Sequence, residues 1–486
     1  MMKPQFQLKD VVILSFILFI ALLFRLYKIG TPLADFHSWR QADTAAVARN
    51  FVKDGIDLLH PRYDDLSGRE SGRENPNGYR MVEFPIYNAI IAFSYKILPI
   101  LPLEIYGRMT SVAFSLLIIT VIYYLLKSEV NRLAAMGASL LYAVFPFFVF
   151  FSRVILPETT ALGFTFLSIF FLYIYSRKNI SRLKSIMSLF LSLVLFSLGI
   201  LVKPTVIFYG IVLFYLFFRK YGFNIPKKFS FYVYFIGAAI PFIIWRIYIR
   251  NFPEGVPVSD WLITSVNTYE GLKNIFLRPA FFRWIFFERI NNIIFGGFAS
   301  FFFVLGISKK SKTFFFHFFL IASLAYLFTF QGGNVQHEYY QTIILPALAI
   351  FSGIGIEFIF NKKLANFFYP YSAHIIAGVI FISSFFFSYY RVRDYYNYPR
   401  DLAKIAKIIE TLTKESEKVV TDTTGDSTLL YLSKRKGAPA LYKDPQTLKE
   451  LGYSHMVIFN KNYIKDLKSK QFTTVFEDDN FALFTL

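Results

Sequence analysis

The chain has 486 residues, of which 55% are hydrophobic and 61 are phenylalanine, and its mean hydropathy is +0.45. Such values exceed those of soluble domains, so the composition excludes an ordinary soluble protein and predicts an integral membrane protein. The net charge of +20 does not imply nucleic acid as a partner, because basic loops that face anionic membrane lipid account for much of such an excess.

Long apolar segments recur along the chain. A helix needs roughly 20 apolar residues to cross about 30 Å of hydrocarbon. The first segment has no small-residue cleavage site before Arg25, so we expect it to remain as an uncleaved span. The pattern predicts a polytopic α-helical membrane protein with about eleven spans, near 11–27, 106–126, 133–151, 159–175, 186–202, 205–219, 229–249, 293–307, 313–330, 342–360 and 368–390.

Basic residues accumulate in alternate connections between these segments. Short cytoplasmic loops hold an excess of Lys and Arg, so this bias predicts a cytoplasmic N-terminus in a cell membrane. An odd number of spans then places loops 28–105 and 250–292 and the C-terminal segment outside. The residues that set this orientation are Lys3, Lys9, Lys127, Arg132, Arg177, Lys178, Arg182, Lys184, Arg219, Lys220, Lys227, Lys228, Lys309, Lys310, Lys312, Lys362 and Lys363.

The first outer loop combines apolar and polar stretches. Apolar residues within 42–51 indicate a short helix along the membrane interface. The polar stretch 64–78, rich in Gly, Ser, Arg and Glu, predicts a mobile loop. A second apolar segment, 85–98, is short for a span.

The tail alternates between helix-like and strand-like patterns. We expect helices near 399–417, 427–434 and 445–451 and strands near 418–423, 455–459 and 481–486. This predicts a small extracytoplasmic α/β domain over 394–486, beside a membrane domain over 1–393 that includes the two outer loops.

Acidic residues in the first loop are candidates for acid–base chemistry. The segment 35–43 holds Asp35, His37, Arg40 and Asp43, and a carboxylate there can accept a proton from an acceptor hydroxyl or amine. If 40–51 is helical, Arg40 and Asp43 lie three residues apart and can pair. Glu83 precedes a further apolar segment and is a second candidate acid. Anchoring of an interfacial helix explains the same residues without chemistry.

Further polar residues collect at the predicted outer ends of later spans. Arg and Lys side chains that converge on one cleft suit a phosphate group, although charged residues at span ends also extend toward water without any ligand. His337 begins a cluster that lacks the second His of a His-Glu-x-x-His zinc motif. The candidate substrate-binding residues are His37, Arg40, Arg153, Glu158, Lys203, His337, Tyr339, Tyr340 and Gln341.

No cofactor or metal is expected. The chain has no cysteine, which excludes disulfides and thiolate chemistry. The adjacent carboxylates Asp64 and Asp65 leave a divalent metal as the alternative.

The order of these motifs resembles the GT-C glycosyltransferases, in the branch of bacterial relatives of protein mannosyltransferases and the lipid A aminoarabinose transferase. The resemblance covers roughly residues 1–390 and rests on Asp43, Glu83-Phe84-Pro85, Arg108, Arg153 with Pro157-Glu158, Lys203, and His337 to Gln341 with Pro346. Two departures stand out. Arg40 precedes Asp43, where relatives place the acid first, and Phe84 stands where some relatives carry Lys.

The resemblance implies transfer of a sugar from a polyprenyl-phosphate donor to an envelope lipid, glycan or protein acceptor at the outer face, with inversion. A first-loop acid would be the base, and we favour Asp43 over Asp35. Arg and Lys groups would bind the lipid phosphate. The alternatives are an oligosaccharide ligase or polymerase, a lipid or sugar transporter, and a non-catalytic scaffold. A transporter would place ionisable groups near the membrane midplane, where the predicted spans carry almost none.

Overall fold

A computed structural model describes residues 6–177, 180–256, 275–310, 313–360 and 371–486. It contains two compact units. The membrane unit comprises Met1–Ile29, Arg108–Trp245 and Asp260–Tyr395, and the loop–tail unit comprises Gly30–Gly107, Arg246–Ser259 and Tyr396–Leu486. Residues 257–274 of the predicted outer loop 250–292 lie outside the described residues, as do Lys3, Lys178, Lys312, Lys362 and Lys363. The loop–tail unit joins the first loop to the tail, so these distant segments fold together.

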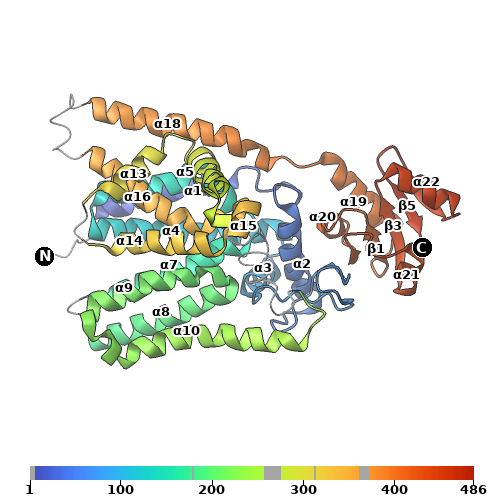
Figure 1. Cartoon of the computed structure of the whole chain (residues 1–486), viewed down its shortest axis with the longest axis horizontal. Coiled ribbons are helices and arrows are strands. Elements are labelled where there is room, and N and C mark those ends of the chain that lie inside the picture. The colour runs from blue at the N-terminus through green and yellow to red at the C-terminus, as the bar shows by residue number, and fades with distance from the viewer. Residues whose placement is uncertain (1–5, 178–179, 257–274, 311–312, 361–370) are drawn as a thin grey trace. The chain divides into compact units, whose positions relative to one another are not determined.

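The membrane unit is helical (Figure 1). Its longer helices are α1 (Leu8–Leu26), α4 (Leu103–Glu129, which begins in the loop–tail unit), α5 (Arg132–Val144), α7 (Pro157–Tyr175), α8 (Arg182–Val202), α9 (Gly210–Tyr221), α10 (Phe229–Tyr248), α14 (Phe315–Thr329), α16 (Leu345–Ile359) and α18 (Ser372–Val392). Shorter helices are α6 (Pro146–Phe151), η1 (Pro204–Tyr209), η2 (Gly222–Lys227), η4 (Ile275–Leu277), α12 (Pro279–Phe282), the π-helix η5 (Arg283–Ile294), α13 (Ser300–Ser308), α15 (Gln331–Gln336) and η6 (Glu338–Ile344).

Seven helical stretches among the described residues are long and apolar enough to cross a membrane. The prediction of a polytopic helical membrane fold is confirmed, while the count of about eleven spans stays a prediction. Two predicted spans are interrupted by a break in the helix. Segment 133–151 divides into α5 and α6 at Pro146, and segment 293–307 is interrupted because Gly296 and Gly297 adopt positive φ angles before α13 begins.

Glycine allows close helix packing in this unit, where α16 contacts both α5 and α13 (Figure 1). A Cβ atom on Gly306 of α13 would lie 1.8 Å from the Phe351 carbonyl oxygen of α16, and one on Gly355 would lie 1.8 Å from the Phe302 carbonyl oxygen. Only glycine permits this backbone approach, which is a common device between membrane helices.

The loop–tail unit starts with helices from the first loop. They are α2 (Ser38–Asp54) and α3 (Ile86–Ile97). Two short helices, η3 (Ile249–Asn251) and η7 (Arg393–Tyr396), lie where the chain later returns from the membrane unit to this unit. Helix α2 is longer than the predicted 42–51. His37 at its N-terminus has a φ angle of 58°, a left-handed conformation that non-glycine residues seldom adopt. The His37 carbonyl oxygen accepts hydrogen bonds from the Arg40 and Gln41 backbone N–H groups.

The tail forms a mixed sheet covered by helices on both faces. Its strands are β1 (Lys418–Thr421), β2 (Gly437–Ala438), β3 (Tyr453–Ile458), β4 (Thr474–Glu477) and β5 (Ala482–Thr485), in the order β2-β1-β3-β5-β4. Strand β1 is parallel to β2 and β3, whereas β5 is antiparallel to β3 and β4. Its helices are α19 (Arg400–Leu412), α20 (Thr428–Leu432), α21 (Pro445–Glu450) and α22 (Lys461–Ser469).

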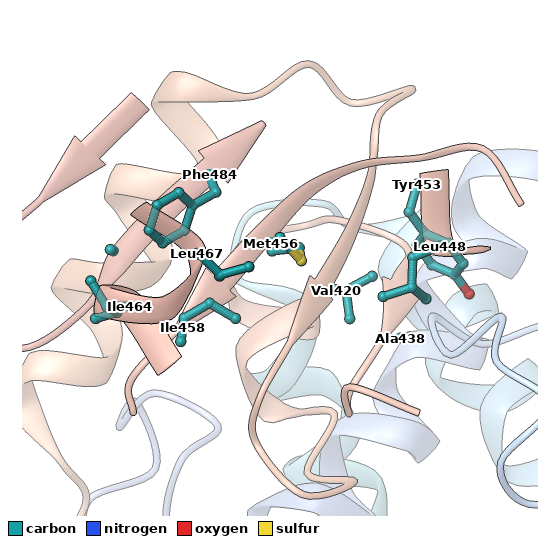
Figure 2. Packing of buried hydrophobic residues seen from close by; sticks show 10 residues of the cluster. Val420, Ala438, Leu448, Tyr453, Met456, Ile458, Ile464, Leu467 and Phe484 are labelled. Carbon is teal, nitrogen blue, oxygen red and sulfur yellow. The ribbon is translucent and has the colours of Figure 1, made fainter. Parts of the chain in front are cut away.

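Alternating side chains produce the two cores of this sheet. On one face, Ile464 and Leu467 of α22 pack with Ile458 and Phe484 of the strands, as Figure 2 shows. On the other face, Val419 belongs to the core under α19 and α20. The small α/β domain is confirmed. The sequence prediction missed β2, α22 and β4, which are short or mostly exposed.

Candidate active site

Asp43 lies in α2, in the loop–tail unit, with only 7% of its surface exposed. Its Oδ1 atom accepts a hydrogen bond from Ser427 Oγ at 2.6 Å, and its Oδ2 atom lies 3.1 Å from Arg80 Nη1. The predicted pairing of Asp43 with Arg40 is therefore wrong, because the cation that contacts Asp43 is Arg80. Each oxygen of this carboxylate contacts a different partner, so the orientation of the carboxylate is fixed.

Arg40 contacts the other acidic motif of the first loop. Its Nη2 atom donates to Glu83 Oε1 at 2.5 Å, and both side chains are largely buried. Asp35 is also buried and accepts a hydrogen bond from Gln41 Nε2 at 2.7 Å. The structure thus brings the four predicted first-loop residues, Asp35, Arg40, Asp43 and Glu83, into one unit around α2.

Two further buried carboxylates lie in the same unit. Asp64 accepts from Arg49 Nη2 at 2.6 Å and 2.5 Å through its two oxygens, and burial nevertheless raises its pKa. Burial raises the pKa of Asp65 to about 7. Asp64 and Asp65 open the segment predicted to be a mobile loop, and both are buried. The mobility of the segment stays a prediction.

Lys203 and Glu158 meet in the membrane unit. Lys203 follows the end of α8, and Glu158 lies in the first turn of α7. Lys203 Nζ is 2.9 Å from Glu158 Oε1 and 5.8 Å from the centre of the Tyr340 ring. The ion pair lacks hydrogen-bond geometry, since neither Glu158 oxygen accepts a hydrogen bond within the described part of the chain. A buried acid, an amine and an aromatic face therefore meet at this point.

Arg153 holds the end of α1. Its side chain is fully buried, and its Nη1 atom donates to the carbonyl oxygens of Tyr27 and Lys28 at 2.6 Å and 2.8 Å. Arg108 Nη1 donates to the Ile29 carbonyl oxygen at 2.6 Å. Carbonyl groups at a helix C-terminus lack partners within the helix and carry partial negative charge, which explains why they attract arginine. Contact of Arg153 with a substrate phosphate stays a prediction.

The cluster His337 to Gln341 lies at the start of η6, with His337 directly before the helix. The rings of His337 and Tyr339 stack with centres 5.4 Å apart, and Tyr339 and Tyr340 are buried. Gln341 is fully buried and donates from Nε2 to the backbone and side-chain oxygens of Asn334 at 2.8 Å and 3.0 Å. These contacts fix the positions of the predicted substrate-binding residues.

Sequence reasoning missed several residues at these sites. Arg80 and Ser427 contact Asp43, Arg49 pairs with Asp64, and Arg289 forms an ion pair with Glu338. Arg80 lies only three residues before Glu83, so its closeness to a predicted site residue could have marked it as a candidate. Ser427 lies 384 residues from Asp43, and no local pattern marks it.

Among the residues that the structure describes, no group of three or more His, Asp or Glu side chains is placed to hold a metal ion. Asp64 instead pairs with Arg49, and Asp65 Oδ1 accepts from the Ser67 backbone N–H at 2.8 Å.

Residues 83–245 match the family described as dolichyl-phosphate-mannose-protein mannosyltransferase. The fold is similar to ArnT from Cupriavidus metallidurans. Its structure bound to undecaprenyl phosphate gives a TM-score of 0.68 at 13% identity over 97% of each chain, and its apo structure gives 0.67 at 12% identity over 97% of each chain. The oligosaccharyltransferase of Archaeoglobus fulgidus in its apo form gives 0.58 at 12% identity over 92% of this chain and 69% of that chain. A search of curated protein sequences found no significant match.

The fold is therefore that of the membrane-embedded GT-C class, to which ArnT and the archaeal oligosaccharyltransferase belong, and part of the chain matches a mannosyltransferase family model. The resemblance predicted from the order of the motifs is confirmed. Within that class, residues 83–245 carry the sequence pattern of the mannosyltransferase family named above.

Proposed function

We propose that this protein transfers a sugar from a polyprenyl-phosphate carrier to an acceptor at the outer face of a cell membrane, with inversion at the anomeric carbon. The observation that carries the proposal is the buried Asp43 carboxylate, oriented by Ser427 and Arg80. Two structures of similar fold also support the proposal. ArnT was crystallised with undecaprenyl phosphate, and AglB of Archaeoglobus fulgidus was solved in complex with dolichol-phosphate and an inhibitory peptide.

In the proposed reaction, Asp43 is the general base. An acceptor hydroxyl or amine attacks the anomeric carbon, a new bond forms there, and the bond from that carbon to the phosphate oxygen breaks. The acceptor proton passes to the Asp43 carboxylate. The polyprenyl phosphate leaves as an anion, so it needs charge stabilisation more than protonation. Asp35 is the alternative base, but its Oδ1 atom already accepts a hydrogen bond from Gln41.

Phosphate recognition is proposed for the membrane unit. Lys203 supplies a cation beside Tyr340, and Glu158 balances its charge before the donor binds. Tyr339, Gln341 and His337 are proposed to contact the sugar or phosphate. Arg40 is proposed to hold Glu83 in place rather than to bind the donor directly, because its Nη2 atom already donates to Glu83.

The topology is part of the proposal. The bias of Lys and Arg toward alternate connections supports a cytoplasmic N-terminus, with both the first loop and the tail outside. In this proposed topology Asp43 lies on the outer side, where lipid-linked sugars serve as donors in place of nucleotide sugars.

Transfer by purified protein tests the proposal directly. The protein in detergent or liposomes would be given a panel of polyprenyl-phosphate sugars with an envelope extract as acceptor, and release of polyprenyl phosphate would be measured. We expect release with at least one donor for wild type and none for Asp43→Asn. Donor that crosses a liposome membrane without being consumed would instead indicate a transporter, and equal release by both proteins would remove Asp43 as the base.

A further inference from the structure

Ser427 reaches the proposed base from the other end of the chain. It directly precedes α20 in the tail, and 3% of its surface is exposed. Its Oγ atom is 2.6 Å from Asp43 Oδ1 and 3.3 Å from the Trp39 carbonyl oxygen. The hydroxyl has a single proton, and the shorter distance assigns that proton to the carboxylate. The Asp43 carboxylate thus accepts a hydrogen bond from Ser427 through Oδ1 and contacts Arg80 through Oδ2.

We propose that Ser427 is a positioning residue for Asp43, so that the C-terminal domain completes the acid–base site of the first loop. This inference rests on the proposed function, in which Asp43 is the base. Ser427 fixes Oδ1 and Arg80 fixes Oδ2, which leaves the carboxylate one orientation while free lone pairs remain for the acceptor proton. A hydroxyl–carboxylate hydrogen bond of this length belongs to the strong, charge-assisted class.

Buried contacts on both sides of Ser427 keep it in place. Asp426 Oδ1 accepts from the Thr428 backbone N–H at 2.8 Å and so begins α20. At the far end of that helix, the Tyr431 carbonyl oxygen accepts from Arg49 Nη1 at 2.8 Å, and the Tyr431 hydroxyl donates to Glu104 at 2.6 Å. Arg49 comes from α2, the helix that carries Asp43. Helices α2 and α20 are therefore joined at two points, one of which is the proposed site.

Backbone pairing adds a third connection between the first loop and the tail. The Gly437 N–H donates to the Asp64 carbonyl oxygen at 2.9 Å, and the Leu66 N–H donates to the Gly437 carbonyl oxygen at 2.6 Å. A Cβ atom at Gly437 would lie 1.8 Å from the Val419 carbonyl oxygen, so glycine is required at this edge of the sheet. The first loop thus extends the tail sheet beside β2, which holds both segments at a fixed distance.

The charged groups around Asp43 come from the same elements. Arg80 is the cation in contact with it, and Asp64, Asp65 and Asp426 are the acids whose titration Asp43 influences. With three acids nearby and one cation in contact, a neutral donor such as the Ser427 hydroxyl orients the carboxylate without adding charge. This explains why a serine suits the position better than a lysine or an acid.

The test compares Ser427→Ala with Ser427→Thr and Ser433→Ala in the full-length protein. Ser433 is also buried in the tail, one residue beyond α20, but its hydroxyl donates only to the Leu429 and Leu430 carbonyl oxygens. A hydrogen bond to a charged group contributes an energy that corresponds to roughly ten- to a hundred-fold in rate. We expect Ser427→Ala to lower kcat by that factor while KM for the lipid donor stays within about two-fold.

Rescue distinguishes positioning from a structural role. Ser427→Thr keeps the hydroxyl and is expected to restore kcat to within about three-fold of wild type, and Ser433→Ala is expected to match wild type. If Ser427→Ala does not yield folded protein, Ser427→Cys keeps the size of the side chain with a weaker donor, and its kcat should fall while its melting temperature holds.

Three outcomes would overturn the inference. Wild-type kcat in Ser427→Ala or Ser427→Cys removes the positioning role. An equal loss in Ser427→Ala and Ser433→Ala, with a matching fall in melting temperature, assigns Ser427 to stability alone. A wild-type protein that releases polyprenyl phosphate from no donor overturns the proposed function and this inference together, which separates that failure from the other two.

Discussion

Arg40 and Glu83 lie 43 residues apart in the sequence and form a buried ion pair of 2.5 Å. The pair links the first turn of α2 to a residue that lies three positions before α3, and so connects two motifs that the sequence presents separately. Removing one partner from such a pair leaves an uncompensated buried charge, which costs about 3–5 kcal/mol.

This pair is therefore expected to show strong coupling. Glu83→Gln and Arg40→Gln should each lower the free energy of unfolding by about 3 kcal/mol, because each removes one partner of a largely buried ion pair. The double variant should lose less than the sum of the two single losses. Thermal unfolding of the four proteins in detergent measures this coupling, and strictly additive losses would contradict a direct interaction.

The two candidate bases should separate by rate. Asp43→Asn keeps the size of the side chain and removes the base, so transfer should fall by roughly 10²–10⁴-fold. Asp35→Asn should cost less than about ten-fold, because Asp35 is already engaged by Gln41. Initial rates of polyprenyl phosphate release measure both. A larger loss for Asp35→Asn would transfer the role of base to that residue.

Lys203 should act on donor binding. Lys203→Met is expected to raise KM for the lipid donor by about ten-fold or more, because the phosphate loses a cation. It also leaves Glu158 buried without its ion-pair partner, which confounds binding with stability. The double variant Lys203→Met with Glu158→Gln restores neutrality. It should regain thermal stability but keep the weak donor binding, and recovery of both would contradict a phosphate role.

Asp65 should make stability depend on pH. Its pKa is about 7 in the folded protein against an ordinary value of 3.8, chiefly because of burial. The folded state therefore holds a proton that the unfolded state releases, and this contribution is present below pH 3.8 and is lost as the pH rises through about 7. Each pKa unit corresponds to about 1.4 kcal/mol. Melting temperatures between pH about 4 and about 8 should fall less for Asp65→Asn than for wild type.

Glu410 provides a control of opposite sign for that experiment. Hydrogen bonds from Lys407 and Lys434 lower its pKa to about 2, so its contribution is constant above the ordinary value of 4.5 and is lost as the pH falls toward 2. Glu410→Gln should therefore shift the melting temperature by the same amount between pH about 5 and about 8, which covers most of the range used for Asp65. Parallel curves for wild type and Asp65→Asn would show that Asp65 titrates normally.

Composition and periodicity were sufficient for the class of fold and for most tail elements, because apolar length and side-chain alternation are local properties. The partners of a side chain in the tertiary structure are not a local property of the sequence. Helical spacing favoured an Arg40–Asp43 pair, yet Arg40 pairs with Glu83 and Asp43 with Arg80. The polar composition of 64–78 predicted a mobile loop, but Asp64 is buried, and the tail supplies backbone partners to Asp64 and Leu66 of this segment. Such partners depend on chain segments hundreds of residues away.

The joining of the first loop to the tail also has a consequence for biosynthesis. Asp43 leaves the ribosome 384 residues before Ser427, which is roughly 20–80 s at 5–20 residues per second. During that interval the first loop lacks the backbone partners that Gly437 later provides to Asp64 and Leu66. The nascent protein must therefore complete its apolar helices with an unfinished loop, and a chain that stops before the tail would remain incomplete in a segment made near its beginning.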